Sequence, residues 1–132
     1  MKYWNDLDGS IFFNKVFSAP VAIGVVQLFA ITIDNNAPNV ILEFDITELP
    51  DMPPEKWKKN GFNTCRIGIN ISNIKNLHIK NVPTKENLVV SISKSSNKYI
   101  VKLSNKDSLI EFTAQHILLC GPSVYMNSTT EM

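Results

Sequence analysis

The residues that most often perform catalysis or bind metal are sparse in this sequence. His78 and His116 are the only histidines, and neither has a histidine, cysteine or carboxylate at the spacing of a zinc site. The five glycines do not cluster, and the chain has no phosphate-binding loop or nucleophile elbow. A Ser-His-Asp or Cys-His pairing that only the fold assembles stays open. We therefore expect no catalytic residue, no metal, no cofactor and a protein that is not an enzyme.

Glu43 and Asp45 are two carboxylates that a strand would place side by side. They lie two residues apart in a segment of alternating apolar and polar residues, so both would face the same side of a strand. Two carboxylates in this arrangement can act as an acid and a base. An exposed acidic strand face is the commoner origin of the same pattern.

A proline-rich connection follows, with the sequence ELPDMPPEKWKK at residues 48–59. Each proline fixes φ and removes a backbone donor, which makes a long loop easier to order. We expect Trp57 to be more than half buried and to hold the loop on the sheet, while its lysine neighbours face water. Long ordered loops on a sheet are also frequent binding surfaces.

The same region concentrates negative charge. Five carboxylates occur from Glu43 to Glu55 without an intervening basic residue. A solvated face is the plainer explanation, and recognition of a basic partner is the functional one. The candidate partner-binding residues are Glu43, Asp45, Glu48, Asp51, Glu55 and Trp57.

An alternative function is a small ligand- or nucleic-acid-binding β domain. It would use Trp57, Phe62 and the neighbouring lysines, since aromatic and basic side chains together stack bases and neutralise phosphates. The formal net charge is only +1, and no nucleic-acid module signature is present. Nucleic acid is therefore not the expected partner.

Length and composition indicate one globular domain over residues 1–132. The mass is 14.8 kDa and the hydrophobic fraction is 44%, which suffices for a core without metal or disulfide support. Residues 1–55 contain eight acidic residues and two lysines, whereas residues 56–132 contain eleven basic and four acidic residues. These charges either mix on the surface or give the protein an acidic face.

Cys65 and Cys120 each lie in an apolar, strand-like run. Free cysteine is among the most buried residue types, and the first fifteen residues lack the apolar core of an export signal. We therefore expect two reduced thiols in the core of a cytoplasmic protein.

Residues 16–33 carry no charge, but Pro20, Gly24 and a β-branched bias favour a turn and a buried strand over a membrane helix.

The hydrophobic pattern predicts a mostly β or α+β fold. A short helix begins near Asp8 or Ser10, either of which can cap it, and ends before Pro20. Its apolar side would consist of Ile11, Phe12, Val16 and Phe17. Alternation predicts strands at residues 25–34, 39–47, 64–71, 74–80, 88–94, 98–104, 108–113 and 116–121.

These elements give seven or eight strands in a single domain. We expect a twisted antiparallel sheet or sandwich with the helix at its N-terminal end. Residues 127–132 form a polar tail that we expect to be frayed.

Several positions resemble the immunity protein 50 family of bacterial polymorphic toxin systems. They include the aromatic pair Tyr3 and Trp4, Gly9, the Phe17…Pro20 pair, PPEKW ending at Trp57, and Asn63 before an alternating strand. After Pro20 the chain reads VAIGVVQ, without the acids and histidine of many members, so no site is carried over from that segment. The resemblance implies a non-enzymatic protein that binds and neutralises a cognate toxin in the cytoplasm. Bacterial toxin domains are often basic nucleases, so the resemblance makes a basic nuclease a candidate partner.

Overall fold

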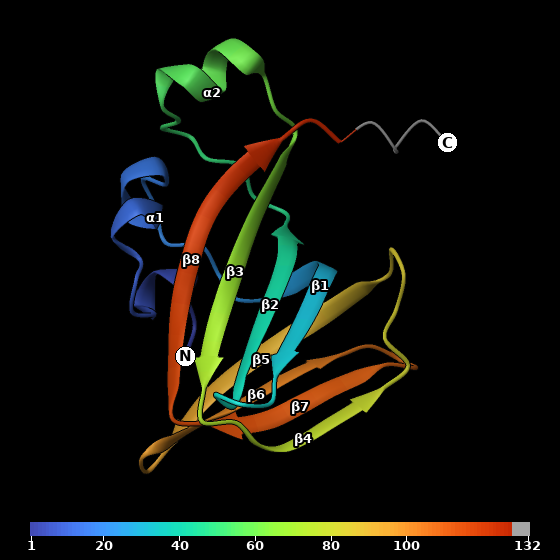
Figure 1. Cartoon of the computed structure of the whole chain (residues 1–132). Helices are drawn as coiled ribbons and strands as arrows, with labels where there is room; N and C mark the ends of the chain where they lie inside the picture. The colour runs from blue at the N-terminus through green and yellow to red at the C-terminus, as the bar shows by residue number, and fades with distance from the viewer. Residues whose placement is uncertain (128–132) are drawn as a thin grey trace.

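The computed structural model describes residues 1–127 and contains one open antiparallel sheet of eight strands (Figure 1). The strand order is β4-β7-β6-β5-β1-β2-β3-β8. The strands are β1 Val25–Asp34, β2 Asn39–Ile46, β3 Thr64–Ser72, β4 Lys75–Lys80, β5 Asn87–Ser95, β6 Lys98–Ser104, β7 Leu109–Ala114 and β8 His116–Tyr125. The helical segments are η1 Trp4–Asp6, α1 Ile11–Val16 and α2 Glu55–Asn60. The predicted fold class and strand number are confirmed.

The sheet bends where β1 meets β5. These two strands pair over only three residues, Val25–Gln27 of β1, so the rest of β1 diverges from β5. In Figure 1, β1, β2, β3 and β8 stand upright, while β5, β6, β7 and β4 run across the lower part. Because of this divergence only Val26 of β1 is fully buried, and the prediction of a buried strand here was wrong.

The hydrophobic core lies on one face of the sheet. Alternate residues of β2 and β3 point into it, as their apolar-polar alternation predicts. The N-terminal segment covers this face, with Trp4 only 1% exposed and its ring 5.3 Å from that of Phe44. The buried positions of these strands are Val40, Leu42, Phe44, Ile46, Cys65, Ile67, Ile69 and Ile71.

Helix α1 buries only part of the apolar side that was predicted. Val16 and Phe17 are buried as predicted, whereas Ile11 is exposed and Phe12 is only partly covered. Phe13 takes the inner position instead, because residues 13, 16 and 17 share one side at i, i+3 and i+4 spacing. Ser10 is the N-cap residue, but its hydroxyl donates to the Asn5 carbonyl instead of capping.

The connection between β2 and β3 contains helix α2, which the proline-rich sequence did not lead us to expect. Pro54 precedes it, Glu55 lies in its first turn, and Lys58 and Lys59 lie in its last turn, where the helix dipole favours these charges. Gly61 ends the helix with a φ of 73°.

The end of β8 is fixed to the start of β3. The Asn63 side chain donates to the Asn127 carbonyl at 3.1 Å and accepts from the Asn127 amide at 2.7 Å. The first residue of the predicted frayed tail is therefore held, and the prediction for residues 128–132 lies outside the described residues. No helix within residues 1–127 is long and apolar enough to cross a membrane.

Candidate functional site

The helical segments leave open the face of β1, β2, β3 and β8 that lies opposite the core. We call it the outer face. Phe29, Ile41 and Leu118 on these strands are exposed, and the latter two alternate with buried residues. An uncovered sheet face with large apolar side chains is where a binding surface is expected.

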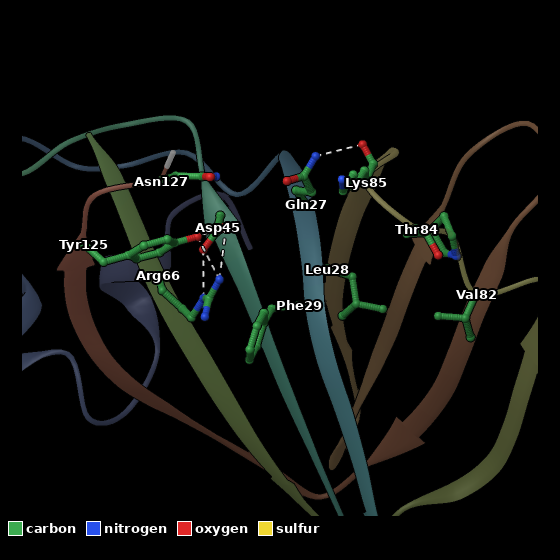
Figure 2. A pocket seen from close by; sticks show the side chains of 11 residues that line it. Gln27, Leu28, Phe29, Asp45, Arg66, Val82, Thr84, Lys85, Tyr125 and Asn127 are labelled. Atoms are coloured by element: carbon green, nitrogen blue, oxygen red, sulfur yellow. Dashed lines mark hydrogen bonds and ion pairs between the residues drawn. The ribbon is translucent and has the colours of Figure 1, made fainter. Parts of the chain in front are cut away.

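A polar network lies at the centre of the outer face. Arg66 donates from Nε to Asp45 Oδ1 at 2.9 Å and from Nη2 to Asp45 Oδ2 at 3.3 Å (Figure 2). Arg66 Nη2 also donates to the Tyr125 hydroxyl at 2.8 Å, and that hydroxyl donates to Asp45 Oδ2 at 2.7 Å. Register explains the ion pair, because Asp45 and Arg66 are direct cross-strand partners on β2 and β3.

The network keeps its charges in place. Burial acts to lower the pKa of Arg66, but the hydrogen bonds and charge of Asp45 outweigh it, so the pKa is raised. Burial, followed by the hydrogen bond to Asp45, raises the pKa of Tyr125, so its hydroxyl stays a proton donor. The arrangement is a fixed network in which both charges have partners.

Phe29 completes the cluster from a β-bulge. The register between β1 and β2 shifts between Leu28 and Ala30, which leaves Phe29 as an extra residue. Its ring centre lies 3.6 Å from the Arg66 guanidinium carbon, and the Tyr125 ring centre lies 4.6 Å from it. Figure 2 shows Arg66 between these two rings. Phe29 nevertheless stays 60% exposed.

This cluster borders a hollow of about 590 Å³. The segment from Val82 to Lys85 forms its far side, and Gln27 Nε2 donates to the Lys85 carbonyl at 2.8 Å across the gap. Among the residues that line it within the described chain, there is no histidine or cysteine. Arginine, tyrosine and phenylalanine are enriched in protein interfaces, so the composition is typical of protein binding.

The structure divides the six predicted partner-binding residues between two places. Glu43 and Asp45 lie on the outer face, and both are partly buried. Asp51 accepts from the Ser18 amide at 2.9 Å and from the Ser18 hydroxyl, and these bonds lower the pKa of Asp51. Ser18 follows α1, so this part of the acidic run turns away toward the helices.

The other predicted residues also lie near the helices. Glu48 is exposed on the connection, and Glu55 pairs with Lys58 within α2 at 3.3 Å. Trp57 is partly buried, as predicted, with its ring 5.6 Å from Phe12 of α1 and 6.5 Å from Phe62. The indole therefore holds α2 against α1, while its lysine neighbours are exposed.

Sequence reasoning missed Arg66, Tyr125 and Phe29. The available signal was that Arg66 is the sole arginine among thirteen basic residues and falls on the polar side of an alternating strand. Its pairing with Asp45 depends on strand register, and the exposure of Phe29 depends on a bulge. Neither the register nor the bulge can be read from the residue pattern of a single strand.

The cysteine prediction was half wrong. Cys65 is buried and free, whereas Cys120 is free but exposed on the outer face. The β8 register shift between the partners of Arg66 and Gly68 places Cys120 opposite Gly68, which has no side chain to cover it. The apolar run around Cys120 in the sequence does not show that its cross-strand partner is a glycine.

The residues that carry the family resemblance support the scaffold behind the sheet. Trp4 packs in the core, and Phe17 stacks on Phe13 with ring centres 4.6 Å apart. Gly9 has a φ of 85° and lies against β8, where a Cβ would meet the Leu119 carbonyl oxygen at 2.5 Å. Asn63 joins the ends of β3 and β8.

Comparison with known proteins agrees with this resemblance. The family model described as Immunity protein 50 matches residues 9–125, which include all eight strands and both α-helices. Among curated proteins and among solved structures, none matches the chain significantly. The family match spans most of the 132 residues, and the chain therefore belongs to the immunity protein 50 family.

Proposed function

We propose that this immunity protein neutralises a cognate bacterial toxin by stoichiometric binding in the cytoplasm of the cell that makes the toxin. Family membership supports an immunity role and implies a toxin partner in general. The proposed mechanism is occlusion of the active or substrate-binding surface of the toxin, without a cofactor and without catalysis by the immunity protein.

The outer face is the proposed contact surface. The observation that carries this choice is the exposed Phe29 ring stacked on a guanidinium that Asp45 and Tyr125 hold in place. Such a cluster loses little side-chain entropy on binding, because its polar members are already fixed. Aromatic and arginine side chains also contribute most of the affinity at many protein interfaces.

Charge on this face favours a basic toxin, such as a nuclease. Glu43 and Asp45 contribute two negative charges beside the single positive charge of Arg66. The lysines concentrate elsewhere, because residues 75–114, which form β4 to β7, contain seven lysines and three acidic residues. A basic partner would approach the outer face faster than the lysine-bearing strands, and this preference would weaken with salt.

Co-expression tests the proposal. The probe is the C-terminal domain of a large secreted protein encoded directly upstream of this gene, expressed in a susceptible bacterium. We expect growth to be restored by the wild-type immunity protein, and a 1:1 complex on size-exclusion chromatography with light scattering. Unchanged killing together with the absence of a complex would overturn the proposal.

Two matched double variants test the surface. Phe29→Ala with Glu43→Lys alters the outer face, and we expect it to fold but to lose protection. Glu48→Lys with Glu55→Lys alters exposed residues of the connection beside the helices, and we expect it to protect like the wild type. If the Glu48/Glu55 variant loses protection and the Phe29/Glu43 variant keeps it, the contact lies on the proline-rich connection instead.

A further inference from the structure

A second, smaller hollow lies on the outer face above Gly68. Its volume is about 200 Å³, and it borders the network around Arg66. Gly68 of β3 is the direct cross-strand partner of both Glu43 on β2 and Cys120 on β8. The central strand of these three therefore has no side chain between Glu43 and Cys120. A Cβ at Gly68 would lie 3.8 Å from Glu43 Cγ and 3.7 Å from Cys120 Cβ. These two side chains therefore flank the hollow.

Glu43 lines this hollow, and no other side chain of the described chain pairs with it. Among the described residues it has no hydrogen bond and no ion pair, in contrast to Asp45, which binds both Arg66 and Tyr125. The charge of Glu43 contributes to the raised pKa of Arg66, but the printed hydrogen bonds of Arg66, from Nε and Nη2, go to Asp45 and Tyr125. The face therefore has one carboxylate in excess.

A second unsatisfied acceptor lies one row away. Asn70 Oδ1 is buried and has no hydrogen-bond partner within the described chain. Asn70 alternates with the buried Ile69 and Ile71, so it belongs to the outer face, and its cross-strand partner on β2 is Ile41. Because this oxygen is buried and Asn70 does not line the hollow, Glu43 is the acceptor that a partner can reach there.

We propose that this hollow receives an arginine side chain of the toxin partner, an inference that rests on the proposed function. The aliphatic part of the arginine would lie over Ile41, Gly68 and Cys120, and its guanidinium would donate to Glu43. A guanidinium has five N–H donors in a planar fork, so it can bind both oxygens of the Glu43 carboxylate at once. A lysine offers a compact point charge and would bind these two oxygens with less specific geometry.

A titration with a small molecule tests the hollow without the toxin. The probe is Nα-acetyl-arginine methylamide, and the control is the citrulline analogue, which keeps the shape and lacks the charge. In ¹H–¹⁵N spectra we expect millimolar binding with shifts centred on the Ile41, Gly68 and Cys120 amides, and at least fivefold weaker binding of citrulline. Equal binding of both, or no shift at these amides, would overturn the proposal.

Variants locate the effect. Glu43→Gln removes the charge, and Gly68→Val fills the hollow; each is expected to weaken the arginine probe at least fivefold. Gly68→Ala is the safer companion, because its Cβ would meet neighbours only at ordinary contact distances of 3.5 Å or more, and it should weaken binding less than valine does. Glu111→Gln is the matched control, because Glu111 lies opposite Lys102 and His78 in the sheet and should leave binding unchanged.

Affinity for the upstream-encoded toxin domain separates the two proposals. We expect Glu43→Gln and Gly68→Val to weaken the complex at least tenfold, and Glu111→Gln to leave it unchanged. If all variants bind and protect like the wild type, the proposed function holds and the arginine pocket is overturned. If the wild type binds no toxin, the proposed function fails, and the arginine probe alone then decides whether the hollow is a cation site.

Discussion

The guanidinium carbon of Arg66 lies 3.6 Å from the centre of the Phe29 ring, so an exposed aromatic side chain rests on a fixed cation. The two residues come from β3 and β1, with β2 between them. Arg66 is fixed by Asp45 and Tyr125, whereas Phe29 projects from a bulge. The two residues therefore differ, because Arg66 is held by its neighbours whereas Phe29 stays exposed, as the proposed contact surface requires.

Phe29→Ala should weaken toxin binding without unfolding the protein. The ring is 60% exposed, so its removal should change the free energy of unfolding by less than about 1 kcal/mol. Loss of an aromatic anchor at an interface typically costs about 2 kcal/mol or more of binding free energy. Calorimetric titration and urea denaturation measure the two quantities. Ile33→Ala, at the far end of the same strand, is the control, and an equal loss of affinity there would contradict a specific role for Phe29.

Arg66→Ala should destabilise the fold, and Asp45→Asn should reverse part of the loss. Without Arg66, the Asp45 side chain, which is only 12% exposed, retains a charge without its ionic partner. We expect a loss of about 2 kcal/mol in the free energy of unfolding, less than for a fully buried pair because solvent reaches this site. The Arg66→Ala/Asp45→Asn double variant removes the stranded charge. A double variant less stable than Arg66→Ala would show that the charge is not the cause.

The large features of this fold were predictable because each depends on a local pattern. Val40, Leu42, Phe44 and Ile46 alternate with polar residues, and the strand that they form buries all four. Helix α1 was located correctly, but of its predicted apolar side only Val16 and Phe17 are buried, because six residues do not define a periodic face. Phe13 lies inward because α1 packs against β8, which is a distant part of the chain.

The site was harder to predict because it depends on register. Glu43 and Asp45 form one short acidic pattern in the sequence, yet Asp45 pairs with Arg66 whereas Glu43 lies beside the empty position of Gly68. Their difference comes from residues on a neighbouring strand more than twenty positions away. Local charge patterns show where carboxylates gather, and strand pairing decides which of them is left for a partner.

The two cysteines should differ sharply in reactivity. Burial raises the pKa of the Cys65 thiol to about 12, and the charges of Asp45 and Glu48 add to the effect. The reactive form of a thiol is the thiolate, so buried Cys65 should resist alkylation at neutral pH while exposed Cys120 reacts. Intact-mass measurement should show one modification of the native protein and two in denaturant without reductant. Two rapid modifications of the native protein, or none in denaturant, would contradict this assignment.

Cys65 should also make the protein less stable in alkali. Its pKa is raised from an ordinary value of 9.0 to about 12 on folding. Above pH 9 the unfolded chain releases this proton and the folded protein keeps it, so stability is retained below pH 9 and lost between pH 9 and 12. The loss should approach about 1.4 kcal/mol per pH unit. Urea denaturation from pH 8 to 10.5 should show a shallower decline for Cys65→Ala, and the same decline as the wild type for Cys120→Ala.

Gly9→Ala should be among the most damaging single-methyl additions to this protein. Gly9 combines a φ of 85° with a close approach to β8, where a Cβ would lie 2.5 Å from the Leu119 carbonyl oxygen and 2.8 Å from Leu118 Cδ1. The amide of Leu119 donates to the Asp8 carbonyl at 2.8 Å, so relieving the clash would break the bond that fixes the N-terminal segment to β8. We expect a loss of about 3 kcal/mol or more in the free energy of unfolding by urea denaturation. Gly24→Ala is the matched control, since a Cβ there meets no atom within 4 Å, and it should change stability by less than about 0.5 kcal/mol. Equal effects of the two substitutions would mean that the contact between Gly9 and β8 is not what holds this edge of the sheet.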